Sequence, residues 1–297
     1  MSNGESNNIS RRKAILSIAT LTAGVLVNPV AFVSAAPVQS SLRFAIIGDW
    51  GNGNNDQFAT AQQMYTTFQA NPFDFVLTVG DNIYPDGSGH LLQSYFEQPY
   101  APLLRAGVKF YAALGNHDVI HGRQDQCQYP LFNMNQRCYY SLSQGNGLVE
   151  IFILDSTDLD RTQLGWLEGA LRASKARWKL ALFHHPLYSS GRYHGSDLSL
   201  RQQLEPLFIQ YGVHMVFSGH DHIYERTHPQ QGIIYFVTGA AGMTRQGDTD
   251  RESELTAAYF DTDNHFMFIE IDARQISYSA ISETGKIVDQ GKLIRFR

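Results

Sequence analysis

Residues 42–51 read LRFAIIGDWG, a mainly apolar run that stops at Gly48 and is followed at once by Asp49. A short run of this kind, bounded by glycine, is typical of a buried β-strand. A carboxylate directly after such a strand lies at the strand's carboxyl end, where α/β sheets bind their ligands. The stretch therefore predicts a strand that carries a functional acidic residue at its end.

Four further apolar runs end in the same way, at residues 73–79, 108–114, 178–183 and 213–217. They lead into four polar motifs: Gly80-Asp81-Asn82-Ile83-Tyr84, Gly115-Asn116-His117-Asp118, His184-His185-Pro186 and Gly219-His220-Asp221-His222. Helix-like stretches accompany them, at residues 58–70, 91–104, 162–174 and 198–211. Strands that alternate with helices favour a largely parallel α/β sheet. We therefore expect all five polar motifs at the carboxyl ends of the strands.

The C-terminal part of the sequence has a different pattern. Residues 233–237, 265–271 and 276–281 look like antiparallel strands that close a second sheet. Residues 119–136 are long and polar, and we expect a loop at the mouth of the site there. No linker composition interrupts residues 36–297, which predicts a single catalytic domain over this range.

The composition excludes several classes of protein. An apolar fraction of 43% over 297 residues is typical of a globular chain with a substantial core. The balance of 23 basic and 28 acidic residues, a formal net charge of −5, argues against a nucleic-acid partner. Two cysteines cannot build a disulfide framework or a cysteine-rich zinc module. The 11 histidines are the unusual feature that remains.

The N-terminus has the order of an export signal. The paired arginines Arg11 and Arg12 precede an uncharged stretch, residues 14–33, and small residues follow around Ala35. This order favours a twin-arginine signal over residues 1–35. An uncleaved membrane anchor is the alternative, but the polar residues of the stretch make it weakly hydrophobic for a permanent span.

Cleavage after Ala35 would remove three basic and one acidic residue, which changes the formal net charge from −5 to −7. The mature protein would be exported to the periplasm or the extracellular space, with no stable membrane span. Such an oxidising destination would allow Cys127 and Cys138 to pair, although two free thiols remain the alternative. The sequence defines no oligomeric state.

Taken together, the polar motifs have the composition of a metal site. They supply two Asp, one Asn, one Tyr and three His, and these oxygen and imidazole ligands suit Fe, Mn or Zn. Each motif alone is a weak signal, because Gly-Asp after a strand is a common turn. Two metal ions that share a bridging carboxylate hydrolyse phosphate esters, and five motifs in order predict such a two-metal site.

The ordered motifs resemble those of the calcineurin-like metallophosphoesterases over about residues 42–240. Tyr84, three residues after Asp81, narrows the resemblance to the purple acid phosphatases of the small, tartrate-resistant-like type. This implies a four-layer α/β/β/α sandwich, with two mixed sheets flanked by helices and the site at the strand C-terminal ends. It also implies an acid phosphatase that hydrolyses small phosphomonoesters by attack of a metal-bound hydroxide.

The resemblance also implies a ligand set, carried over position by position. A ferric ion would be held by Asp49, Asp81, Tyr84 and His222. A divalent ion, Fe²⁺, Zn²⁺ or Mn²⁺, would be held by Asp81, Asn116, His184 and His220, so that Asp81 bridges. His184 is preferred because the family ligand lies two residues before the proline, here Pro186. We expect His185 to be a packed or solvent-facing neighbour.

Two further histidines fall near the expected phosphate. The resemblance places His117 beside the ligand Asn116, and His194 matches a family histidine with an offset of one residue. As imidazoles that bind substrate together with Asn116, they could stabilise the transition state or protonate the leaving group. A surface-loop histidine is the alternative for His194. We expect the remaining histidines to have ordinary roles.

Other functions are compatible with the same motifs. A phosphodiesterase or a nucleotidase would use the same metal site, and a non-catalytic exported protein that binds metal or phosphate would keep only its ligands. The acidic net charge does not exclude an anionic substrate, because the local charge of bound metal ions would hold it.

We expect Trp50 and Asn82 to shape their turn, and Asp155 to be a turn residue.

Overall fold

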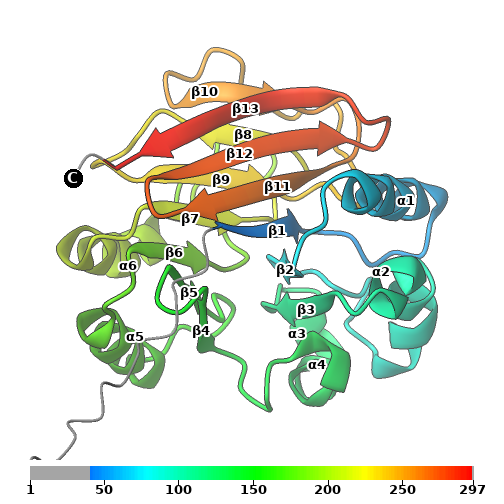
Figure 1. The fold of residues 1–297 in the computed structure, drawn as a ribbon, viewed down its shortest axis with the longest axis horizontal. Coiled ribbons are helices and arrows are strands. Elements are labelled where there is room, and N and C mark those ends of the chain that lie inside the picture. The colour runs from blue at the N-terminus through cyan, green and yellow to red at the C-terminus, as the bar shows by residue number, and fades with distance from the viewer. Residues whose placement is uncertain (1–40, 296–297) are drawn as a thin grey trace, which may run out of the picture. The chain divides into compact units, whose positions relative to one another are not determined.

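A computed structural model describes residues 41–295 of the chain (Figure 1). The predicted export signal, residues 1–35, lies outside the described residues. Thirteen strands within the described range form two mixed sheets, one of six strands and one of seven. The first sheet has the order β13-β12-β11-β1-β2-β3 and the second the order β10-β8-β9-β7-β6-β5-β4.

The strands of the first sheet are β1 (Ser41–Ile47), β2 (Phe75–Thr78), β3 (Lys109–Ala112), β11 (His265–Asp272), β12 (Gln275–Ser282) and β13 (Ile287–Ile294). Within this sheet β1, β2 and β3 run parallel, whereas β11 lies antiparallel to β1 with Phe44 opposite Ile269. The parallel half brings the residues that follow β1, β2 and β3 to one end of the sheet.

The strands of the second sheet are β4 (Tyr140–Gln144), β5 (Val149–Ile153), β6 (Trp178–Leu182), β7 (Met215–Ser218), β8 (Tyr224–Thr227), β9 (Ile234–Thr238) and β10 (Thr256–Phe260). Its centre is parallel, because β5, β6, β7 and β9 pair in parallel registers. The strands β4, β8 and β10 pair antiparallel with their neighbours, and β4 and β10 form the two edges of the sheet.

The longer helices begin at side chains that cap them. They are α1 (Asn55–Ala70), α5 (Arg161–Ala173) and α6 (Leu198–Tyr211), and each follows a residue, Asn54, Asp160 or Asp197, whose side chain accepts a backbone N–H of the first turn. The shorter helices are α2 (Ala101–Arg105), α3 (Asp118–His121), α4 (Arg123–Gln128), η1 (Gly89–Leu91), η2 (Gln93–Glu97) and η3 (Pro130–Phe132). Figure 1 shows α5 and α6 beside β4 to β6, and α1 and α2 beside β1 to β3.

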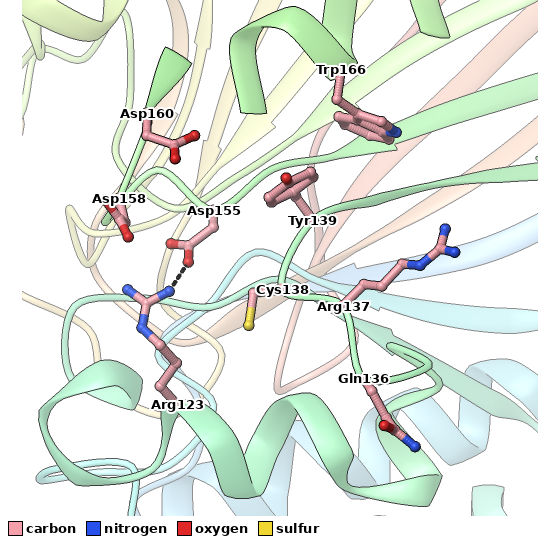
Figure 2. A pocket seen from close by; sticks show the side chains of 9 residues that line it. All are labelled: Arg123, Gln136, Arg137, Cys138, Tyr139, Asp155, Asp158, Asp160 and Trp166. Atoms are coloured by element: carbon pink, nitrogen blue, oxygen red, sulfur yellow. Dashed lines mark hydrogen bonds and ion pairs between the residues drawn. The ribbon is translucent and has the colours of Figure 1, made fainter. Parts of the chain in front are cut away.

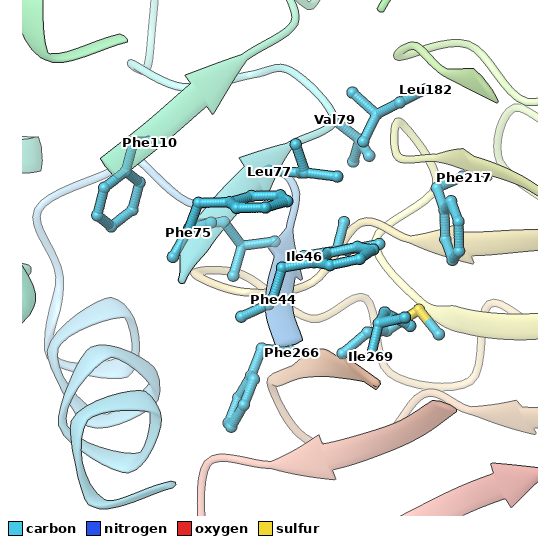
Figure 3. Packing of buried hydrophobic residues seen from close by; sticks show 14 of the residues in the cluster. Phe44, Ile46, Phe75, Leu77, Val79, Phe110, Leu182, Phe217, Phe266 and Ile269 are labelled. Atoms are coloured by element: carbon cyan, nitrogen blue, oxygen red, sulfur yellow. The ribbon is translucent and has the colours of Figure 1, made fainter. Parts of the chain in front are cut away.

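The main core lies between the two sheets. Phe44 and Ile46 of β1 belong to the same buried cluster as Leu182 of β6 and Phe217 of β7 (Figure 3). A second cluster packs α5 and α6 on the outer face of the second sheet through residues such as Phe208. Two mixed sheets flanked by helices confirm the fold that the resemblance to the metallophosphoesterases implied.

Two sequence-based expectations were wrong in detail. Residues 234–238 pair in parallel with β7, whereas β11 and β12 join the first sheet beside β1, so the C-terminal strands do not close a sheet together. The segment 119–136 is not a plain loop, because α3, α4 and η3 occupy most of it. Cys127 and Cys138 form a disulfide across this segment, which confirms the expected pairing.

Candidate metal centre

The predicted site residues lie where parallel strands end. Asp49 follows β1, Asp81 follows β2 and Asn116 follows β3, while His184 follows β6 and His220 follows β7. Asp49, Asp81 and His220 have positive φ angles of 55°, 49° and 71°, a region that side chains other than glycine rarely adopt. Such backbone strain is concentrated at functional sites, where the surrounding fold enforces it.

The carboxylates of Asp49 and Asp81 both contact the hydroxyl of Tyr84. The hydroxyl of Tyr84 lies 2.9 Å from Asp81 Oδ2 and 3.3 Å from Asp49 Oδ1, and His222 Nε2 lies 3.2 Å from the same hydroxyl. Asp49 Oδ2 also accepts the backbone N–H of His220 at 3.0 Å. The Tyr84 hydroxyl therefore contacts each of the other three side chains assigned to the first predicted metal.

The second predicted group is equally compact. His184 Nε2 lies 3.0 Å from Asn116 Oδ1, 3.2 Å from His220 Nδ1 and 3.5 Å from Asp81 Oδ2. His184 Nδ1 faces the carbonyl of Val79 at 3.0 Å, and since a carbonyl only accepts, this nitrogen carries the hydrogen. The Nε2 lone pair of His184 is thereby directed at the cluster, in the neutral form that binds metal ions.

The electrostatics of the cluster fit a bound cation. Asp49 and Asp81 are almost fully buried, and within residues 41–295 no lysine or arginine forms an ion pair with either. Burial raises the pKa of both carboxyls, and their mutual repulsion raises that of Asp49 further. Burial likewise raises the pKa of Tyr84 and lowers the pKa of His184. Uncompensated buried acids beside neutral imidazoles form a donor set that a metal ion would satisfy.

His117 and His194 flank this cluster from two sides. The ring of His117 lies 4.6 Å from that of Tyr84, and its Nδ1 lies 2.6 Å from the carbonyl of Pro85. His194 is exposed, and its ring centre lies 3.8 Å from that of His220. The structure thus brings both predicted imidazoles to the mouth of the candidate metal centre.

His185 is also part of the cluster. It packs as expected, with Nδ1 at 2.9 Å from Ser156 Oγ, but its ring lies 4.6 Å from that of His220. Ligand atoms of His184, His185 and His220 lie within 4.8 Å of one another, as do those of Asp49, Asp81 and His184. Proline spacing alone could not show that His185 faces the other imidazoles.

The sequence did not reveal two residues that organise the site. The fully buried carboxylate of Asp118 accepts the backbone N–H groups of Gly115, Asn82 and Ile83 at 2.8–3.0 Å, which fixes the turn between Asp81 and Tyr84. Asp221 accepts the Ser189 hydroxyl at 2.6 Å from the loop that carries His194. Both acids lie inside motifs that were recognised, but their partners are distant in sequence.

Trp50, Asn82 and Asp155 shape turns next to the site. Trp50 donates to Asn82 Oδ1 at 3.2 Å, so these residues do shape the turn after β2. Asp155 accepts the backbone N–H of Thr157 at 3.0 Å and so forms a turn as expected. It also pairs with Arg123, a contact across the sequence that the pattern did not indicate.

The fold and the cluster at its strand ends define a metallophosphoesterase. The family model described as calcineurin-like phosphoesterase matches residues 42–224, and the chain belongs to that family. Its members cleave phosphate esters, so the chain is an enzyme of the phosphoesterase class.

Several relatives are named acid phosphatases. Purple acid phosphatase 17 of Arabidopsis thaliana is 29% identical over 288 residues, which cover 85% of this chain and 85% of the relative. Tartrate-resistant acid phosphatase type 5 of Homo sapiens is 28% identical and aligns over 86% of this chain and 91% of its own length.

Solved structures share the fold at lower identity. The yellow lupin purple acid phosphatase PPD1 has a TM-score of 0.74 at 20% identity, with 88% of this chain and 55% of that chain covered. A structure described as GAP50, the anchor in the inner membrane complex of Plasmodium, has a TM-score of 0.76 at 20% identity, with 87% and 90% covered. At these identities the likeness concerns the fold alone. Within residues 41–295, no helix has the length and apolar character needed to span a membrane.

Proposed function

We propose that this protein is an acid phosphatase with a binuclear metal centre that hydrolyses phosphomonoesters. One observation carries the proposal. Asp81 Oδ2 lies 2.9 Å from the hydroxyl of Tyr84 and 3.5 Å from Nε2 of His184, so a single carboxylate faces a donor of each predicted metal group. That is the position a bridging ligand needs.

The proposed ligands follow from these contacts. Asp49, Asp81, Tyr84 and His222 would hold Fe³⁺, and Asp81, Asn116, His184 and His220 would hold the divalent ion, Fe²⁺, Zn²⁺ or Mn²⁺. Bound ions would supply Lewis-acid chemistry and lower the pKa of bound water. The chain's contribution is to fix the donors on strand ends that belong to two packed sheets.

The two flanking histidines have distinct tasks in this proposal. The carbonyl of Pro85 accepts a hydrogen bond from His117 Nδ1, which leaves His117 Nε2 free to hold a proton for a phosphoryl oxygen or the leaving oxygen. His194 is exposed above His220, where it would orient the substrate phosphate together with Asn116 and His117.

The reaction is tested with the purified chain reconstituted with iron and zinc. We expect release of phosphate from p-nitrophenyl phosphate at acidic pH, and slower cleavage of the bis-ester. His117→Ala should lower kcat by roughly 100-fold, which is within the range of general acid-base catalysis. The control Glu254→Gln, an exposed acid at the far edge of the second sheet, should leave kcat unchanged.

The alternatives give different results in the same assay. Faster cleavage of the bis-ester would indicate a phosphodiesterase. No turnover of any ester by the metal-loaded protein would contradict catalysis and favour a non-catalytic binding protein.

We further propose that residues 1–35 direct export through the twin-arginine route and that residues 36–297 form the mature single catalytic domain, in the periplasm or outside the cell. The Cys127–Cys138 disulfide supports this localisation, because disulfides persist mainly in oxidising compartments. Replacement of Arg11 and Arg12 by lysine should retain the uncleaved chain in the cytoplasm, as measured by fractionation.

A further inference from the structure

A cavity of about 620 Å³ lies at the end of β5, outside the predicted metal ligands (Figure 2). Its walls come from α4, the segment before β4, the turn after β5 and the start of α5. The volume falls in the range of pockets that hold small organic molecules. Neither the motifs nor the proposed catalytic chemistry uses this cavity.

Two aromatic rings form one wall of the cavity. Tyr139 precedes β4 and Trp166 lies in α5, and their ring centres are 5.1 Å apart with planes inclined by 52°. Both side chains are half-buried, so part of each ring remains accessible from the cavity. Figure 2 shows the two rings side by side, opposite the pair formed by Arg123 and Asp155. Such a wall provides stacking area for a planar ring.

The charged groups of the cavity differ in their pairing. Asp155 is 2% exposed and pairs with Arg123, whose guanidinium also donates to Thr157 Oγ1 at 2.7 Å. By contrast, the Asp158 carboxylate and the Arg137 guanidinium have no hydrogen bond or ion pair to another described residue. The cavity therefore offers one free acceptor group and one free donor group, which lie on opposite sides of the two rings (Figure 2).

A short structural path joins the cavity to the candidate metal centre. Asp155 in the cavity wall precedes Ser156, whose Oγ lies 2.9 Å from His185 Nδ1. The strands β5 and β6, which end at the cavity and at His184, are adjacent and parallel. Neighbouring strands are about 4.8 Å apart, so a ligand of nucleotide size could occupy both places.

We propose that this cavity binds the nucleoside part of a phosphorylated substrate. The base stacks against Tyr139 and Trp166 with its edge toward the Arg137 guanidinium, and the sugar hydroxyls extend toward the Asp158 carboxylate on the other side of the rings (Figure 2). A nucleoside fits because it combines a planar face that stacks, acceptor atoms on the base edge for a guanidinium, and sugar hydroxyls that donate to a carboxylate. The assignment of the phosphate to the metal centre rests on the proposed function, whereas binding of the nucleoside does not.

Binding can be measured without catalysis by using adenosine, which carries no phosphate. The chain has three tryptophans, and Trp50 and Trp178 are fully buried, so Trp166 is the one that reports on the cavity. We expect adenosine to quench the tryptophan emission of the metal-loaded protein in a saturable manner. The quench should disappear in Trp166→Phe, and its absence in the natural protein would overturn the proposal.

Kinetics then test whether the bound nucleoside belongs to the substrate. The ratio of kcat/KM for adenosine monophosphate to that for glycerol phosphate should fall about tenfold in Trp166→Ala, which corresponds to the loss of one base stack. Asp158→Asn should lower the same ratio, and Glu254→Gln should not. An unchanged ratio in both cavity variants would contradict the substrate role. Failure of all phosphatase turnover would contradict the proposed function and leave the adenosine measurement intact.

Discussion

The carboxylate of Asp221 accepts the backbone N–H of His194 at 3.2 Å. The same carboxylate accepts the N–H of Gly195 at 3.1 Å, and a side chain at Gly191 would place its Cβ 2.4 Å from the Asp221 carboxyl carbon. Because Asp221 lies between His220 and His222 in sequence, it ties the loop of His194 to the strand end that carries two proposed ligands.

This relationship predicts the effect of Asp221→Ala. This variant loses the hydrogen bonds to Ser189, His194 and Gly195 of the loop. The loss should displace His194 and lower kcat by roughly 10- to 100-fold, because a catalytic group misplaced by about 1 Å can slow a reaction by that factor. Asp221→Asn, whose amide oxygen still accepts a hydrogen bond, should have a smaller effect. The loss should be absent in a His194→Ala background, where the displaced group no longer exists. An equal loss in both backgrounds, or a parallel loss of bound iron, would show that Asp221 acts on the metal ligands instead.

Tyr84 gives a spectroscopic prediction. If its phenolate binds Fe³⁺, the iron-loaded protein should be purple through a charge-transfer band, and Tyr84→Phe should lose that band while the cluster keeps Asp49 and Asp81. Tyr65→Phe serves as the matched control, since Tyr65 is a half-buried tyrosine of α1 whose ring stacks on Phe68. A colourless but active natural protein would instead indicate zinc or manganese at both positions.

Asp118 should matter for stability more than its place in a motif suggests. Asp118→Ala would leave the buried backbone donors of Gly115, Asn82 and Ile83 without an acceptor. At about 1–3 kcal/mol for each of these three unsatisfied groups, we expect the free energy of unfolding to fall by at least about 3 kcal/mol. Urea unfolding measures the change.

Asp125→Ala provides the comparison for Asp118→Ala, because Asp125 is exposed on the neighbouring helix α4. Its effect should stay within about 0.5 kcal/mol, as is usual at the surface. Similar losses in the two variants would mean that the Asp118 hydrogen bonds contribute little to stability.

The strand ends of this fold could be predicted from the sequence because the signal is local. An apolar run that stops at glycine and a polar residue, as at Asp49, marks both the strand and its functional end. The resemblance to the purple acid phosphatases implies which of these residues bind metal, and the structure brings Asp49, Asp81 and His184 together.

Pairing between distant segments could not be predicted in the same way. Nothing in the periodicity of residues 265–272 indicates that β11 pairs with β1 and not with β9, because any apolar strand can satisfy either neighbour. The roles of Asp118 and Asp221 also depend on partners that only the fold brings close, such as Asn82 and His194. The cavity beside β5 arises from four separate segments for the same reason.

His265 illustrates a pH dependence that arises away from the metal centre. Its ring is fully buried, with Nε2 at 3.1 Å from Thr238 Oγ1 and no partner for Nδ1 among the described residues. Burial alone lowers the pKa of His265 from 6.5 to about 3. Between these two values the unfolded chain binds a proton that the folded chain does not, so the free energy of unfolding falls as the pH falls.

This loss of stability is absent above the pKa that His265 has in the unfolded chain. Below that pKa it grows by up to about 1.4 kcal/mol per pH unit. His265→Gln keeps a donor for Thr238 but does not titrate. Relative to this variant, the natural protein should lose roughly 2–3 kcal/mol of stability between about pH 7 and pH 4. Urea unfolding of both proteins in the presence of a chelator measures the difference, because acid release of metal then contributes equally. If the difference in stability between the two proteins stays constant with pH, the prediction is wrong. His265 would then take up a proton in the folded protein as readily as in the unfolded chain.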